Sequence, residues 1–532
     1  MKNSGDRQNV FVLRRYWQKH RYKAKRIHKS WVGVDTGLKA VLTDLFIVFQ
    51  ICCILAVYAI IVAAVPITFL FACVLTVLTM IYVAIEERDV QSKISWILLL
   101  FISFGSGFLI YVLASKQVCY GAKRSRFNKI AGRLPPPQPS AETPALAEAA
   151  ASGEGEEDVF GYLENNGFYA YAHTDGKYYA NARNILDNII ACVSEAKKFV
   201  FIEFFIVADG VYLERLIAEF RRKTAEGVEI YMLCDDVGCA GVLSDYAKKR
   251  IKAAGVHFAV FHKLFSPFYF GLNFRDHRKI VVVDGKIGFV GGFNLIDDCA
   301  NERKMEGVWK DSGVKITGEA VDSLSNIFMR QWEFAVKKPL DPQKYLGLYE
   351  PSENTARYAP YAGGPEITEP VCRNVYMQLI NSAKERLYIM TPYLVPDSGI
   401  MRRLKERAKE GVDVRLILPG VPDYRYIYRV TTSNARRLKK AGVKICYSGG
   451  EFVHAKVMLS DGVAAVGSVN LDMRAFYQEL DNGIVTDDKK VIAGVEEDFE
   501  RIFTRNGYAG KFRNNPFNIV VTGILRLVSP LM

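Results

Sequence analysis

The sequence predicts an α/β protein made of two similar halves, each a mixed sheet flanked by helices, behind an amino-terminal region of transmembrane helices. Three observations predict this architecture. Strand-like runs alternate with amphipathic helices over most of the chain, one eight-residue motif occurs twice, and 41 consecutive residues near the amino terminus carry no charge. At 532 residues the chain is long enough to hold more than one domain.

The uncharged run covers residues 45–85. At about 1.5 Å per residue, a helix of this length far exceeds the ~30 Å hydrocarbon core of a bilayer. Val65-Pro66 near its middle predicts a turn between two spans, and residues 94–115 form a further uncharged stretch. We therefore expect about three transmembrane helices within residues 42–115 and a multi-pass protein of the cell membrane. A cleaved signal peptide explains the pattern less well, because the run is too long and begins too late.

The positive charge of the chain is concentrated in a basic amino-terminal tail. Of the formal net charge of +13, residues 1–41 contribute +9, from eleven Lys or Arg and two Asp. Such a tail is attracted to anionic lipid by roughly 1 kcal/mol per basic residue near the surface. It is equally typical of a cytoplasmic topology signal. A nucleic-acid enzyme would carry this excess around its active site, so nucleic acid is not an expected partner.

The charge pattern and the number of apolar spans give conflicting predictions of the membrane topology. The basic tail and a second basic run at residues 116–133 both favour the cytoplasmic side, whereas three spans place them on opposite sides. We expect a cytoplasmic amino terminus, three crossings and an external catalytic domain. The alternative is that residues 45–85 cross once and re-enter, which leaves the catalytic domain in the cytoplasm.

The rest of the chain divides by composition. Residues 134–158 are rich in Pro, Ala and Glu with almost no large apolar side chain, so we expect a disordered linker after the basic run, within residues 116–158. The expected tail at the carboxyl end is apolar and either packs on the catalytic domain or lies on the bilayer. The remaining boundaries are a first half at 159–346, an irregular linker at 347–365, a second half at 366–513 and the apolar tail at 514–532.

Both halves show the same order of strand, amphipathic helix and strand, which predicts α/β units. In the first half these are residues 199–207, 213–224 and 228–235, and in the second they are 387–390, 399–410 and 412–418.

The repeated motif is His-x-Lys, four residues and then Asp, with an Asp-Gly pair at its end. The two copies lie 177 positions apart, and each is followed by small residues and an Asn. The first copy comprises His277, Lys279, Asp284 and Asn294, and the second comprises His454, Lys456, Asp461 and Asn470.

The spacing of the motif indicates its chemistry. The apolar runs 280–283 and 457–459 predict strands, and residues two apart on a strand face the same side, so His and Lys project together. Asp-Gly predicts a hairpin turn, and the returning strands, 287–290 and 463–466, bring in the Asn. His can attack or move protons near neutral pH, Lys supplies positive charge and Asn a neutral donor. A lone His on a strand is more often structural, but the repetition favours a phosphate site.

At these residues the chain resembles the phospholipase D superfamily, whose signature is this paired motif, and from about residue 94 onward it resembles the bacterial cardiolipin synthases. Where family members commonly have Glu after the second motif, this chain has Asp481. Further segments that carry the resemblance are 202–206, 235–238, 309–311, 391–397 and 419–423.

The resemblance implies a pseudo-twofold arrangement that brings both hairpins into one cleft. One His would attack phosphorus to form a phosphohistidine while the other protonates the departing alcohol, without a metal or other cofactor. The motif residues are then catalytic, although the hairpin positions of Asp284 and Asp461 indicate a structural role. Asn294 and Asn470 would bind phosphate oxygens with the two Lys. Asp311 and Asp481 would orient the two His, the alternative being that they are surface charges.

The implied reaction joins two phosphatidylglycerol molecules into cardiolipin and glycerol, with anionic phospholipid and a membrane as partners. The competing enzyme is a membrane-bound phospholipase D that produces phosphatidic acid. A nuclease of the same superfamily is disfavoured by the apolar spans and the charge distribution. A membrane scaffold with a relict site is disfavoured because all motif positions are intact. The ten Cys show no zinc-binding pattern.

Overall fold

The computed structural model describes residues 52–53, 56–60, 66–86, 89–103, 105–114, 116–140, 158–262, 274–303, 307–508, 522–523 and 525–526. The basic tail at 1–41, most of the expected linker after residue 140 and most of the apolar tail at 514–532 lie outside these residues.

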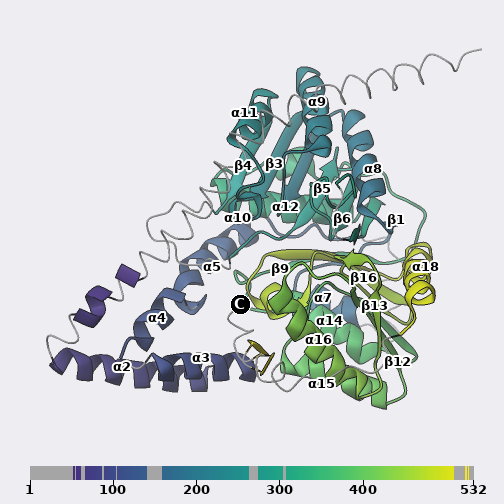
Figure 1. Cartoon of the computed structure of the whole chain (residues 1–532). Coiled ribbons are helices and arrows are strands. Elements are labelled where there is room, and N and C mark those ends of the chain that lie inside the picture. The colour runs from purple at the N-terminus through teal and green to yellow at the C-terminus, as the bar shows by residue number, and fades with distance from the viewer. Residues whose placement is uncertain are drawn as a thin grey trace, which may run out of the picture.

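Two seven-stranded sheets have the same topology (Figure 1). The first has the order β1-β8-β6-β5-β2-β3-β4 and the second β9-β18-β16-β15-β10-β12-β13. In each, four antiparallel pairings are followed by two parallel ones. The strands of the first sheet are β1 Thr174–Tyr179, β2 Phe199–Phe204, β3 Glu229–Asp235, β4 His257–Phe261, β5 Lys279–Val283, β6 Ile287–Gly291 and β8 Gly313–Gly318. Those of the second are β9 Tyr358–Gly363, β10 Arg386–Met390, β12 Asp413–Pro419, β13 Lys444–Ser448, β15 Val457–Ser460, β16 Val463–Gly467 and β18 Asp481–Thr486.

Helices flank both sheets, as the alternating pattern predicts. Every strand and helix expected above from periodicity in the two halves is present with bounds within a few residues. The helices of the first half are α7 Val159–Asn165, α8 Ala182–Ser194, α9 Val211–Ala225, α10 Asp236–Cys239, α11 Asp245–Ala253, α12 Val321–Val336 and α13 Pro342–Tyr345. Those of the second are α14 Val371–Ser382, α15 Ser398–Lys409, α16 Arg425–Lys439, α17 Met473–Tyr477 and α18 Lys489–Asn506.

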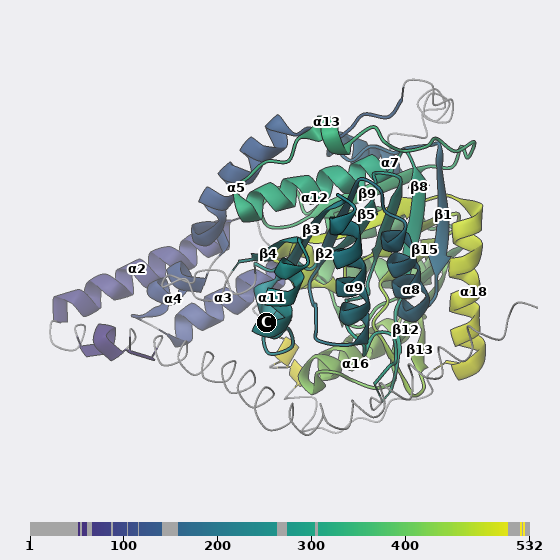
Figure 2. The ribbon, with the colours of Figure 1, turned by 90° about the horizontal axis from the view of Figure 1, so that it is seen from above.

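The two halves share one core. A single cluster of buried apolar side chains includes Phe201 and Val314 of the first half with Leu387 and Tyr361 of the second. Strands β6 and β8 lie against β16 and β18 at the centre, and α18 of the second half packs on β1 of the first. Figure 2, seen from above, shows α18 alongside β1. The halves are therefore one packed body, whose contact surface passes between the two hairpins.

The expected linker at 347–365 differs from the structure, because it contains the strand β9. This strand pairs antiparallel with β18 and occupies the edge of the second sheet, as β1 does in the first. Pro360 masked the strand in the sequence, since Pro lacks the N–H that a central strand needs, but an edge strand tolerates it.

The expected linker at 116–158 also differs over its first part. Residues Lys116–Arg133 form the helix α5, and Phe127 and Ile130 join the shared core. The segment after the helix is fastened by hydrogen bonds to α12: Arg330 donates to the Leu134 carbonyl at 2.8 Å, and Asn326 donates to that of Pro135 at 2.9 Å. A few apolar side chains and backbone carbonyls therefore anchor a segment whose composition alone predicts a linker.

The amino-terminal region contains α2 Pro66–Ile85, α3 Val90–Ile102 and α4 Gly107–Ala114. Among the described residues, one helix, Ile67–Ile85, is long and apolar enough to cross a membrane, and its side chains are largely exposed. The single helix expected over residues 94–115 is not found, because the chain turns between α3 and α4. Gly105 in this turn has φ +88°, which is outside the helical region. A multi-pass topology is not supported.

The two motif aspartates occupy equivalent turns at the far end of β5 and β15 from the histidines. Asp284 has φ 56° and Asp461 has φ 47°. The carboxylate of Asp284 accepts hydrogen bonds from three consecutive backbone amides, Lys197 to Phe199, at 2.7–3.0 Å. That of Asp461 accepts three from residues 384–386 at 2.7–3.1 Å. Each aspartate thus fixes the hairpin to the start of the neighbouring strand.

We expect Asp284→Ala to destabilise the protein by roughly 1–3 kcal/mol, the range for losing hydrogen bonds to a charged acceptor. Asp284→Asn, which keeps one acceptor oxygen, should lose less. Thermal unfolding of purified protein in detergent measures both. An unchanged unfolding midpoint together with lost turnover would instead give Asp284 a direct part in the chemistry.

Candidate active site

Each histidine is held by the other half of the chain. The backbone N–H of His277 donates to the Leu480 carbonyl at 2.8 Å, and Leu480 N–H donates to the Arg275 carbonyl at 2.9 Å. The backbone N–H of His454 likewise donates to the Lys310 carbonyl at 2.7 Å. Just before His454, β14 Glu451–Val453 pairs in parallel with β7 Val308–Lys310. The segment leading to each His is thus joined to the segment that carries the other half's aspartate.

The result is an exchange of carboxylates between the halves. Nδ1 of His277 lies 2.8 Å from Oδ1 of Asp481, and Nδ1 of His454 lies 2.7 Å from Oδ2 of Asp311. A carboxylate at Nδ1 fixes the tautomer with the proton on that nitrogen and leaves Nε2 as the nucleophilic or proton-carrying atom. Asp311 and Asp481 are both fully buried, so they are not surface charges.

Both lysines of the motif lie beside their histidines and are buried. Lys279 Nζ donates to the His277 carbonyl at 2.5 Å, and Lys456 Nζ lies 2.9 Å from His454 Nδ1. Burial lowers the pKa of Lys279 to about 7, with Lys456 adding to the effect, and burial lowers the pKa of Lys456 to about 8. Two cations in one dry site make it suited to an anion.

The histidines are also shifted toward their neutral forms. Burial lowers the pKa of His454 to about 4, and the nearby Lys456 charge acts in the same direction. Burial and then Lys279 hold the pKa of His277 well below its ordinary value. A neutral imidazole is the form that attacks phosphorus. An incoming anion would raise these pKa values, so that one histidine can then carry a proton.

The orienting aspartates have different surroundings. Burial acts to raise the pKa of Asp311, but His454 and Lys456 outweigh it and hold the pKa below its ordinary value. Asp311 also accepts from the backbone N–H of Ser312 at 3.0 Å and from Trp309 Nε1 at 3.2 Å. Burial raises the pKa of Asp481 to about 6, partly offset by Lys279 and by the Ser468 hydroxyl, which donates to it at 2.6 Å.

One motif position explains part of this difference. Ser468, which supplies the hydroxyl to Asp481, corresponds to Gly292 in the first copy of the motif. A Cβ at position 292 would lie 2.5 Å from Asp311 Oδ1 and 3.0 Å from Lys456 Cδ. The first copy therefore requires Gly, because the carboxylate and lysine that serve His454 approach its backbone closely.

The two asparagines are buried near the motif. Asn294 uses its side-chain carbonyl to accept from the Ile206 N–H at 3.2 Å. The Asn470 carbonyl oxygen is buried with no hydrogen-bond partner in the described part of the chain. A contact with phosphate oxygens would come from the side-chain Nδ2 of either asparagine, because an amide oxygen only accepts hydrogen bonds.

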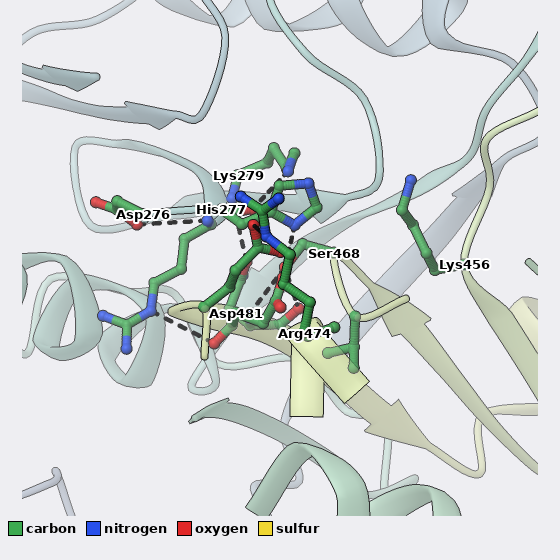
Figure 3. A network of polar contacts seen from close by, with 12 residues as sticks. Asp276, His277, Lys279, Lys456, Ser468, Arg474 and Asp481 are labelled. Atoms are coloured by element: carbon green, nitrogen blue, oxygen red, sulfur yellow. Dashed lines mark hydrogen bonds and ion pairs between the residues drawn. The ribbon is translucent and has the colours of Figure 1, made fainter. Parts of the chain in front are cut away.

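Three further residues of the site were missed by sequence reasoning about function. Figure 3 shows Ser468 and Arg474 gathered around His277 and Asp481, with Lys456 across from them. Arg474 Nε lies 2.7 Å from Oε1 of the buried Glu479. Arg278, fully buried, donates to the Asp481 carbonyl at 3.4 Å and pairs with Glu366 at 3.1 Å. The sequence offered one signal for Arg278, which is that a charged residue stands between His277 and Lys279 where the second copy has Ala455.

His277, Glu479 and Asp481 have potential metal-ligand atoms within 4.8 Å of one another. Their atoms already serve each other, however. Asp481 Oδ1 accepts from His277 and Ser468, and Glu479 pairs with Arg474. The donor set does not fit a metal well, since a metal would displace the contacts that orient His277.

Two His–carboxylate pairs, two lysines and a pseudo-twofold α/β frame define a phosphodiester-transferring enzyme of the phospholipase D type. Two segments of the chain, residues 189–332 and 376–503, match the family model described as "Cardiolipin synthase, PLD-like domain". The chain belongs to this family, which confirms the resemblance drawn from the motifs.

Named relatives agree with this membership. The chain is 30% identical over 469 residues to a cardiolipin synthase of Clostridium perfringens, covering 84% of this chain and 96% of the relative. It is 34% identical over 365 residues to that of Geobacillus kaustophilus, covering 66% and 71%. Among solved structures, phosphatidylserine synthase of Haemophilus influenzae superposes with a TM-score of 0.55 at 15% identity, covering 70% of this chain and all of that one, which shows a shared fold.

The lowered lysine pKa values predict a limb in the pH profile. Phosphate binding needs both ammonium groups charged, and in the free enzyme Lys279 and Lys456 lose their protons near pH 7 and 8. We therefore expect kcat/KM to fall as the pH rises above about 7 and to fall more steeply above about 8, because this parameter reports the free enzyme. Steady-state rates between about pH 6 and 10 test this, and a flat profile over that range would contradict the assigned role of the lysines.

The exchanged carboxylates predict that Asp311→Asn and Asp481→Asn each lower kcat by about 10²–10⁴-fold, as expected when a histidine loses the acceptor that fixes its tautomer. KM should change little, because neither side chain has to touch substrate. Asp322→Asn, at a buried aspartate of α12, is the matched control and should leave kcat unchanged. A rise in KM with normal kcat in the Asp481 variant would show that Asp481 acts on substrate binding.

Proposed function

We propose that this enzyme transfers a phosphatidyl group from one phosphatidylglycerol to the free glycerol hydroxyl of another, releasing glycerol and forming cardiolipin. The observation that carries the proposal is the facing arrangement of two His–carboxylate pairs with two buried lysines in a member of the cardiolipin synthase family. A phosphodiester anion in this site would lie close to both lysine charges.

The reaction has two steps. Nε2 of one histidine attacks phosphorus, forming a P–N bond as the P–O bond to the leaving glycerol breaks, and the other histidine gives that oxygen its proton. The second histidine then takes the proton of the incoming hydroxyl, whose oxygen forms the new P–O bond as the P–N bond breaks. Lys279, Lys456 and Asn470 stabilise the charge on the other phosphate oxygens.

We also propose that α2 crosses the membrane once and that α3 and α4 enter it from the catalytic side and return. The helix α3, at about 1.5 Å per residue, is too short to cross a ~30 Å core. Both ends of the α3–α4 unit face the catalytic halves: Ser398 Oγ donates to Asp89 at 3.2 Å, and Arg124 of α5 donates to the Pro365 carbonyl at 3.3 Å. With one crossing, the amino terminus and the catalytic halves would lie on opposite sides of the membrane, as they would with three crossings.

Incubation of purified full-length protein with phosphatidylglycerol alone tests the reaction. We expect cardiolipin and glycerol by lipid mass spectrometry. Phosphatidic acid as the main product would mean that water is the acceptor and that the enzyme is a hydrolase.

In the same assay His277→Ala and His454→Ala should each abolish turnover, and the double variant should be little worse than either, because the two histidines act as a unit. Lys279→Met should cost at least ~10²-fold, the scale of one electrostatic donor to a transition state. A single His variant that kept a tenth or more of the activity would contradict a mechanism that needs both.

A further inference from the structure

A cavity of about 330 Å³ lies between the amino-terminal helices and the second catalytic half. It is formed where the first turn of α3 meets α15, α16 and the short carboxy-terminal segment at Arg526. Figures 1 and 2 both show this end of α3 and the yellow segment beside the second half. Gln91 Nε2 donates to the Arg526 carbonyl at 2.7 Å, which joins α3 to the carboxy-terminal segment at the cavity. No residue of the two motifs lines it.

The cavity is strongly basic. Its charged lining consists of five cations and one carboxylate, Glu406, for a formal charge of +4. Glu406 already lies 3.3 Å from Arg403 and 3.8 Å from Arg402. The five cations are Arg402, Lys405, Lys409, Arg437 and Arg526.

Three of the cations, Lys405, Lys409 and Arg437, have no carboxylate close enough to pair with them within the described part of the chain. Burial and then the charge of Arg437 lower the pKa of Lys405. Lys405 is half-buried, whereas Arg402, Lys409 and Arg437 are exposed around the cavity. An anion with several oxygens would stabilise like charges gathered around one cavity.

The position of the cavity identifies the kind of anion. Gln91 stands in the first turn of α3, and Ile94, Leu98 and Ile102 follow it on the same helical face at spacings of three and four residues. All three are exposed apolar side chains, and Ile102 is 73% exposed. An apolar stripe therefore runs from the mouth of a basic cavity along a helix, which matches a molecule with an anionic head and hydrocarbon chains.

We propose that this cavity holds the phosphate headgroup of an anionic phospholipid that is not the reacting substrate, with its acyl chains along α3. The bound lipid would fix the second half at a set height on an anionic membrane. Val395 at the cavity lies in β11 Leu394–Val395, which pairs with β17 Leu471–Asp472 directly after Asn470. The site is thus separate from the catalytic one but joined to it by one strand pair. The inference rests on the membrane placement proposed above.

The double variant Lys405→Gln/Arg437→Gln tests the proposal, with Lys384→Gln/Lys440→Gln as a control that removes the same charge from exposed positions outside the cavity. The full chain in non-ionic detergent is titrated with phosphatidylglycerol, phosphatidylcholine or inorganic phosphate, and the thermal unfolding midpoint is followed. We expect phosphatidylglycerol to raise the midpoint at the lowest concentration. In the cavity variant the half-maximal concentration should rise about 30-fold, the effect of two basic charges near a lipid surface, and in the control it should not change.

Three outcomes would overturn the proposal. An unchanged half-maximal concentration in the cavity variant would exclude the cavity as the binding site, and equal losses in both variants would indicate diffuse surface charge. Stabilisation by inorganic phosphate as strong as that by the lipid, lost in the cavity variant, would identify a free-phosphate site. Cardiolipin formation, measured in the same preparations, reports on the proposed reaction separately. A protein that bound the lipid as expected but made no cardiolipin would contradict only the reaction.

Discussion

The exchange of carboxylates between the two halves is the interaction on which the site depends. Neither half contains a complete His–carboxylate pair, because the carboxylate that contacts His277 lies in the second half and the one that contacts His454 lies in the first. The same exchange is made by the backbone, where each histidine N–H is bound to the residue just before the other half's aspartate. Catalytic geometry and the packing of the two halves are consequently one problem, and a shift between the halves would misplace both imidazoles together.

This dependence explains why so much charge is buried at the contact. Arg275 pairs with Asp235, and Arg278 with Glu366, all of them almost fully buried. Replacing such pairs by apolar residues often stabilises a protein, so ion pairs at this depth are weak grounds for stability. These ion pairs instead hold the site residues in position. Arg278, for example, donates to the carbonyl of Asp481, whose side chain contacts His277. The buried lysines are a different case, because Asp311 and Asp481 offset their charge only in part and their pKa values stay lowered.

Periodicity and the duplicated motif predicted those parts of the fold that are determined by residues close together in the sequence. The strands and helices of both halves follow from apolar runs and turn residues, and the paired His and Lys follow from their spacing. The pairing of each histidine with the opposite aspartate could not be predicted, because it depends on how two sheets meet and not on any spacing within one. The strand β9 was not predicted because it contains Pro360. The missing N–H of a proline weakens a central strand but is tolerated at the edge of a sheet. Helix α5 lies in a segment that was expected to be a linker. It has few apolar side chains, and these stabilise the helix only by packing against α12.

The duplication also shows how one repeated unit gives two different surroundings to its histidine. Strand order and pairing are the same in both halves, yet the two histidines lie in unequal fields. Asp311 is held as an anion by His454 and Lys456, whereas burial raises the pKa of Asp481 to about 6 and the hydroxyl of Ser468 shares its oxygen. Arg278 stands where the second copy has Ala455, and Gly292 where it has Ser468. In the two-step transfer proposed above, one histidine is the nucleophile and the other the proton carrier, and these unequal fields would favour one assignment of the two roles over the other. The substitutions at the non-motif positions are therefore where the halves become chemically distinct.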